Sequence, residues 1–206
     1  QTSFYQRDPW KRLIRTLSLQ NSVTFGTIEE ANDSATRINR LHEVIKGKDE
    51  VTGGYYDALD HEQLLWVHAC LQISSIYFYE KTVRKLTDDE KNQYHDENMV
   101  SAKLVLIDID KTPKTHEELK RWVMEKSREK NYLRLTDVAK DVQDIISGGP
   151  VPKHIKPIWP FISFTAFNTL PDEFKKLYGV KSSKFKSLLL GFLSLIHISE
   201  PTRHRL

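Results

Sequence analysis

Apolar residues recur along this chain mainly at the three- and four-residue spacing of amphipathic α-helices. The clearest stripe consists of Ala31, Ala35, Ile38, His42 and Ile45, in which a histidine takes a position otherwise filled by apolar side chains. This spacing places the imidazole on the face that turns toward the protein core. The pattern therefore predicts a helix over about residues 28–46 with one inward-facing histidine.

Helix boundary signals support this periodicity along most of the chain. In a capping box, a Thr hydroxyl and a Glu carboxylate three residues later satisfy free backbone N–H groups at a helix start. Three such boxes occur, at Thr27 with Glu30, Thr87 with Glu90 and Thr115 with Glu118. Glycines predict helix ends at Gly47, Gly148 and Gly179.

The longest and most apolar helix is expected over residues 60–85, where it should be the central buried helix. One side of it is formed by Leu64, Leu65, His68, Leu71, Ser75, Ile76 and Tyr79. No segment alternates with the period of a strand between hairpin signals, and residues 104–109 also fit a helix end with its loop. The proline-rich residues 148–160 are expected to connect two helices. We predict an all-α fold, a single multi-helix domain.

Composition limits the classes of function. The chain has 206 residues, of which 39% are hydrophobic and 29% charged, as in one soluble globular domain with a core of its own. Its 31 basic and 28 acidic residues are interleaved and give a net charge of +3, so we expect no nucleic-acid partner. The single cysteine, Cys70, excludes an internal disulfide.

Both ends of the chain bear on the domain limits. It begins at Gln1 without a Met or a signal sequence, so we expect a native segment to precede it. Membrane association through that segment stays open beside an intracellular location. Residues 193–203 read L-S-L-I-H-I-S-E-P-T-R, similar to a translated sequencing adapter. We therefore expect a domain over residues 1–192, truncated at both ends, and a non-native tail over residues 193–206.

Two groups of residues are candidates for a binding site. His42 follows Arg37 and Arg40 on the same predicted helix, and an inward histidine beside cations suggests an anionic cofactor. The alternative is a core histidine whose ring is bonded to a backbone carbonyl. A second group, Arg12, Arg15 and Thr16, falls within about one helical turn. It would offer donors to haem propionates or dioxygen, or simply form an exposed basic helix start.

Other enzyme classes lack a motif. The run Tyr94 to Glu97 contains a helical H-x-E, but a di-iron bundle needs two Glu-x-x-His pairs and further carboxylates, and no such pair occurs. Signatures of serine hydrolases, zinc proteases and nucleotide-binding folds are also missing from the sequence.

Seven motifs together carry a family resemblance across residues 8–179. In chain order they are R-L-I-R-T, F-G-T-x-E-E-A, R-I-N-R-L-H-E-V-I-K-G, G-G-Y-Y-D-A-L-D, L-L-W-V-H-A, Y-H-D-E and L-P-D-E-F-K-K-L-Y-G. This series resembles the catalytic domain shared by latex-clearing rubber oxygenases and the ER-bound oxygenases of mycophenolic acid biosynthesis. The resemblance implies a haem pocket between helices and a haem b (iron) cofactor. It also implies an oxidoreductase that uses dioxygen to cleave a carbon–carbon double bond in an isoprenoid or other apolar chain.

The resemblance also assigns roles to individual residues. The proximal ligand of the rubber oxygenases lies in an R-x-R-x-x-H helix, and its position falls on His42, which makes His42 the expected metal ligand. Arg37 matches the first arginine of that pattern. The second arginine falls on Asn39, with Arg40 displaced by one residue. Arg37 and Arg40 are the expected cofactor-binding cations.

The distal motif R-x-x-K-T of the family falls on Arg12, Arg15 and Thr16, with arginine in place of lysine. A guanidinium stays protonated and cannot coordinate iron, so Arg15 is expected to donate hydrogen bonds to dioxygen instead. His68 is a further catalytic candidate, as a distal ligand, a proton donor or a hydrogen-bond partner of a propionate. A core histidine bonded to a helix carbonyl is the alternative for His68.

Two functions from other classes remain open beside the oxygenase. The chain could keep the helical scaffold and bind haem or a lipid without turnover. It could also be a helical interaction domain without a cofactor, in which case the purified protein should be colourless.

Overall fold

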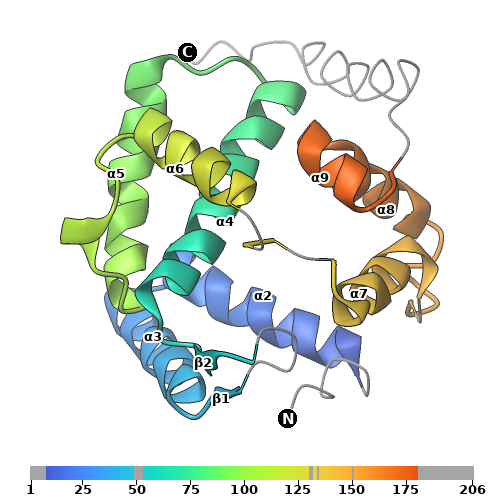
Figure 1. Ribbon diagram of the computed structural model, residues 1–206, viewed down its shortest axis with the longest axis horizontal. Coiled ribbons are helices and arrows are strands. Elements are labelled where there is room, and N and C mark those ends of the chain that lie inside the picture. Colours follow the sequence, from blue (N-terminus) through green and yellow to red (C-terminus); the bar gives the residue numbers. More distant parts are fainter. Residues whose placement is uncertain (1–7, 49–52, 130–131, 134, 150, 181–206) are drawn as a thin grey trace, which may run out of the picture. The chain divides into compact units, whose positions relative to one another are not determined.

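The computed structural model describes residues 8–48, 53–129, 132–133, 135–149 and 151–180. Within these ranges it contains eight α-helices, one short 3-10 helix and one two-stranded sheet, which confirms the all-α prediction (Figure 1). The helices are α2 (Pro9–Phe25), α3 (Ile28–Glu43), α4 (His61–Thr82), α5 (Asp88–Leu104), α6 (His116–Arg128), α7 (Asp137–Gly148), α8 (Trp159–Asn168) and α9 (Asp172–Leu177). The expected tail over residues 193–206 lies outside the described residues and stays a prediction.

Backbone contacts divide the chain into two compact units. The first comprises residues 1–73 and 88–125, and the second residues 74–87 and 126–206, so the boundary falls within α4. All the candidate site residues named above belong to the first unit. No described helix combines the length and the apolar character that crossing a bilayer requires.

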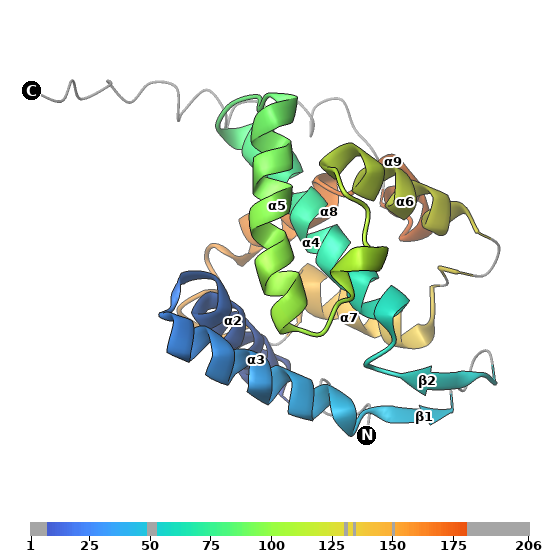
Figure 2. The same cartoon turned by 90° about the vertical axis from the view of Figure 1, so that its left-hand side faces the viewer.

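Helices α2 and α3 form a hairpin. Asp8 begins α2 by accepting a hydrogen bond from the backbone N–H of Lys11 at 2.9 Å. The predicted capping box begins α3: the Glu30 N–H donates to the Thr27 hydroxyl at 3.2 Å, and the Thr27 N–H donates to the Glu30 carboxylate at 2.8 Å. Because only Gly26 and Thr27 connect the two helices and they pack against each other, they run antiparallel (Figure 2). The first turns of α2 therefore lie beside the last turns of α3.

The predicted helix end at Gly47 is wrong. Helix α3 ends at Glu43, and Gly47 lies in strand β1 (Lys46–Lys48), which pairs antiparallel with β2 (Tyr55–Asp57). A salt bridge of 3.0 Å joins Lys46 Nζ to Asp57 Oδ2 across this pair. The pairing draws the chain into an extended conformation four residues early, so Ile45 leaves the predicted stripe and is 41% exposed.

The core of the first unit lies between α4, α5 and α6. It consists of Leu64, Leu65, Ala69, Ala102, Ile107, Leu119 and Val123. The predicted buried side of α4 is only partly right, because Leu71 is 55% exposed and Ser75 and Tyr79 are exposed as well. The buried side continues instead through Ala69, Gln72 and Ile76, a spacing that also fits one face of a helix. The buried face of α4 is thus rotated about the helix axis relative to the predicted face, and Gln72 lies in the interior.

The second unit contains α7, α8 and α9. Thr136 begins α7 by accepting from the Ala139 N–H at 3.2 Å, as predicted. The indole of Trp159, at the start of α8, donates to the Ile146 carbonyl at 3.0 Å and so holds α8 against α7. The described part of the proline-rich segment connects these two helices, and Gly179 (φ 64°) follows α9 as a helix stop, which confirms both predictions.

Candidate functional site

The hairpin brings the two predicted groups of site residues to one end of the first unit. Because α2 and α3 are antiparallel, residues near the start of α2 lie across from residues near the end of α3. Those residues are Arg12, Arg15 and Thr16 on α2 and Arg37, Arg40 and His42 on α3. The sequence predicted the two groups from separate motifs, and the hairpin places them together.

The four arginines at this end are exposed, and their guanidinium groups have no hydrogen bond or ion pair with another described residue. Beside the α2 cations, the apolar residues Leu13, Ile14 and Leu17 are 40%, 53% and 54% exposed. Exposed apolar side chains next to unpaired cations form a surface that suits an amphipathic anion. We call this surface the hairpin end, defined by these apolar residues with the six residues named above.

His42 is the one imidazole on the hairpin end. Its side chain is half-buried, as the stripe predicted, and its Nδ1 atom is buried without a hydrogen-bond partner. Burial lowers the pKa of His42, so the ring is neutral at pH 7. A neutral imidazole with an unengaged nitrogen is the form that ligates a metal.

Asn39 has a structural role in this fold. Its Nδ2 group donates to the carbonyl of Leu104, the last residue of α5, at 3.0 Å. This contact satisfies a carbonyl that a helix end leaves without an intrahelical partner. The position that holds the second arginine of the family pattern therefore joins α3 to α5 here, and Arg40 is the cation that remains exposed beside His42.

His68 is placed apart from the hairpin end. It is half-buried on α4, and its Nε2 atom is buried without a partner. Burial, with a smaller electrostatic contribution from His95, lowers the pKa of His68 to about 4. The neighbouring charge that affects His68 is that of His95 on α5. Within the described residues, no interaction joins His68 to the arginines of α2 and α3.

A buried polar cluster between α4, α5 and the segment before α6 was missed by the sequence analysis. Gln72 is 2% exposed and His95 is 1% exposed. The amide Nε2 of Gln72 lies 2.9 Å from His95 Nδ1, and His95 Nε2 lies 3.0 Å from the Pro113 carbonyl oxygen. The signal was present in the spacing, because His95, Met99 and Ala102 recur at i, i+4 and i+7.

Two more histidines lie near this cluster. His116, 7% exposed, has a buried and unpartnered Nδ1 atom, and burial lowers its pKa. His61, at the start of α4, is half-buried, and its Nδ1 atom accepts a hydrogen bond from the Asp108 N–H at 3.3 Å.

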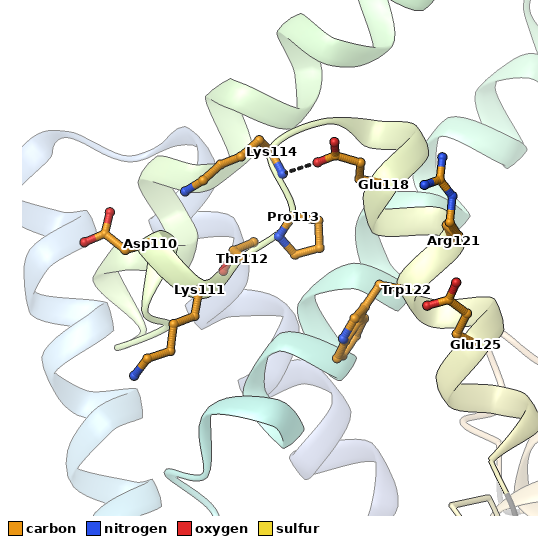
Figure 3. Close-up of a pocket in the computed structure, with 9 residues that line it drawn as sticks. All are labelled: Asp110, Lys111, Thr112, Pro113, Lys114, Glu118, Arg121, Trp122 and Glu125. Atoms are coloured by element: carbon orange, nitrogen blue, oxygen red, sulfur yellow. Dashed lines mark hydrogen bonds between the residues drawn. The ribbon is translucent and has the colours of Figure 1, made fainter.

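A recess of about 490 Å³ opens beside Pro113 at the start of α6 (Figure 3). It is lined by Asp110, Lys111, Thr112, Pro113, Lys114, Glu118, Arg121, Trp122 and Glu125. The Lys114 N–H donates to Glu118 at 2.9 Å, and its Nζ donates to the Ile109 carbonyl at 2.7 Å. This lining is mostly charged, so we do not place an apolar substrate in it.

The described residues contain no group of three or more His, Cys, Asp or Glu side chains that could hold a metal ion. The buried histidines therefore do not form a metal cage among themselves. A haem iron needs only one axial ligand from the protein, and the half-buried His42 offers one.

Comparison with known proteins identifies the family of this chain. Residues 1–197 match the family model described as "ER-bound oxygenase mpaB/B'/Rubber oxygenase, catalytic domain". No curated protein and no solved structure matches the chain. The matched range includes every residue of the hairpin end and of the buried polar cluster.

Proposed function

Because the chain belongs to this family of oxygenase catalytic domains, we propose that it binds one b-type haem at the hairpin end and uses dioxygen to cleave a double bond in an apolar chain. We infer that His42 is the axial ligand of the iron and that the substrate is an isoprenoid. The observation that carries the proposal is the neutral, unengaged imidazole of His42 beside four unpaired arginines.

The residues of the hairpin end fit a haem chemically. Haem b is an apolar ring with two carboxylates, and this surface offers exposed leucine and isoleucine side chains together with free guanidinium groups. Guanidinium pairs well with carboxylate because it can form two parallel hydrogen bonds. The unpartnered nitrogen of His42 supports a ligand role, since a buried polar atom without a partner is unfavourable.

Bound haem would supply the redox chemistry that activates dioxygen. The chain's own part is to bind and orient. Arg37 and Arg40 would hold the propionates, while Arg12, Arg15 and Thr16 would donate hydrogen bonds to dioxygen. Arg15 remains protonated and acts only as a donor.

The test is the UV–visible spectrum of the full chain purified from cells supplied with haem, with a pyridine haemochrome assay. We expect a Soret band and about one haem b per chain. A colourless protein with a helical circular dichroism spectrum would overturn the proposal and favour a cofactor-free interaction domain. A haem-loaded protein that consumes no dioxygen with isoprenoids of any length would favour the non-catalytic alternative.

Replacing Arg37 and Arg40 together with glutamine should weaken haem affinity roughly tenfold, which corresponds to about 1.4 kcal/mol. Both substitutions remove charge-assisted hydrogen bonds to the propionates and leave the axial ligand in place. Haem titration should therefore show a higher dissociation constant with an unchanged Soret position. Arg121→Gln is the matched control, because Arg121 is also exposed but lies on α6. Equal affinity in the double variant and the wild type would contradict the propionate role.

The family description includes ER-bound members. For this chain we propose only that any membrane association uses residues outside the described helices.

A further inference from the structure

The hydrogen bonds of the buried polar cluster have a fixed direction. The Pro113 carbonyl can only accept, so His95 must carry its proton on Nε2. His95 Nδ1 is then an acceptor, and the group of Gln72 that lies 2.9 Å away must be the donating NH₂. The carbonyl oxygen Oε1 of Gln72 therefore points away from His95 as an acceptor.

That acceptor has no partner among the described residues. Gln72 is 2% exposed, so water cannot reach Oε1 freely, and this buried oxygen accepts no hydrogen bond. His68 lies four residues earlier on α4, and residues at this spacing are neighbours on one helix face. Its Nε2 atom is also buried without a partner. The two atoms are not hydrogen-bonded to each other in this structure, but they are complementary if His68 carries its proton on Nε2, and an adjustment of the two side chains would join them.

We propose that Gln72 and His95 are positioning residues for His68. In this arrangement Gln72 Oε1 accepts a hydrogen bond from His68 Nε2–H. The chain of bonds then runs in one direction, from His68 to Gln72 to His95 to the Pro113 carbonyl. It fixes the tautomer of His68 and leaves the lone pair on Nδ1, the nitrogen that is not among the buried unpartnered atoms.

This arrangement defines what His68 can do. A neutral ring with a lone pair on Nδ1 accepts a hydrogen bond or a proton, from water or from a hydroxyl group of a ligand. The lowered pKa of His68 agrees with this, because the ring is uncharged at pH 7. Of the three roles predicted from the sequence, a proton donor and a hydrogen-bond partner of a propionate no longer fit, because the free nitrogen and a carboxylate are both acceptors. The assignment itself depends only on α4, α5 and the Pro113 carbonyl, whereas its use in oxygenation rests on the proposed function.

The experiment is a long-range ¹H–¹⁵N correlation spectrum of the full chain labelled at histidine, at pH 7. His68 is assigned by the loss of its signals in His68→Phe. We expect one nitrogen shift typical of N–H, at Nε2, and one typical of a lone-pair nitrogen, at Nδ1. In Gln72→Leu the two shifts should move toward each other, because the ring then exchanges between tautomers.

The matched control is Gln63→Leu, which replaces an exposed glutamine of the same helix and should leave the His68 signals unchanged. A wild-type ring protonated on Nδ1, or an unchanged His68 spectrum in Gln72→Leu, would overturn the proposal. If Gln72→Leu does not fold, the same spectrum of Gln72→Met and the tautomer of His68 in the wild type still test the proposed hydrogen bond. These spectra need no haem, so failure here is distinct from failure of the haem proposal.

Discussion

Substitution of His42 with alanine is expected to abolish stoichiometric haem binding. The imidazole is the single protein ligand that we assign to the iron; it is half-buried, and the exposed arginines of the hairpin end cannot replace it. Loss of residues that merely support a metal ligand lowers affinity about 10- to 100-fold, so loss of the ligand itself should cost on the order of 100-fold or more. Haem titration, followed by the Soret band and the pyridine haemochrome, measures this directly.

The matched control for this substitution is His154→Ala. His154 is exposed in the connection between α7 and α8, and its loss should change neither the Soret position nor the stoichiometry. A circular dichroism melt separates loss of haem from loss of fold. Retention of one haem with an unchanged Soret band in His42→Ala would contradict the assignment. His68→Phe would then be the next variant, since His68 on α4 is also half-buried and neutral at pH 7.

The parts of the fold that could be predicted depend on local signals. The capping box at Thr27 and the cap at Thr136 act within four residues, so the sequence locates both helix starts. The end of α3 could not be placed in this way. It depends on the pairing of Lys46 with Asp57, eleven residues further on, and glycine at position 47 was a misleading signal.

For the candidate site too, local motifs could be predicted from the sequence, whereas contacts between helices could not. His42 followed from an apolar stripe, and the motifs around Arg12 and Arg37 were visible in the sequence. Their common location depends on the α2–α3 hairpin, which no single motif contains. Gln72 and His95 were missed because polar residues within a helix usually face solvent. Their burial requires each to satisfy the other, and that pairing joins α4 to α5.

Acidification from pH 7 to pH 5 is expected to lower the free energy of unfolding by about 2 kcal/mol through His68 alone. Burial lowers the pKa of this ring to about 4, against an ordinary value of 6.5. Between these two values the unfolded chain binds more protons than the folded chain, so stability falls as the pH falls. His95 and His116, whose pKa values burial also lowers, change stability in the same direction.

Between pH 7 and pH 5 the change in stability comes from the histidines and not from the carboxylates with lowered pKa values. Hydrogen bonding lowers the pKa values of Asp57 and Asp108 below the ordinary 3.8, so the stability that they contribute is lost only in more acidic solution. Urea unfolding at pH 7 and pH 5 gives the change in free energy. His68→Phe should reduce the fall by about 2 kcal/mol, whereas His154→Ala should not alter it. An equal fall in wild type and His68→Phe would mean that folding does not lower the pKa of His68. The tautomer of His68 tests the contact with Gln72 separately, because a protonated ring still carries the Nε2–H group that this contact needs.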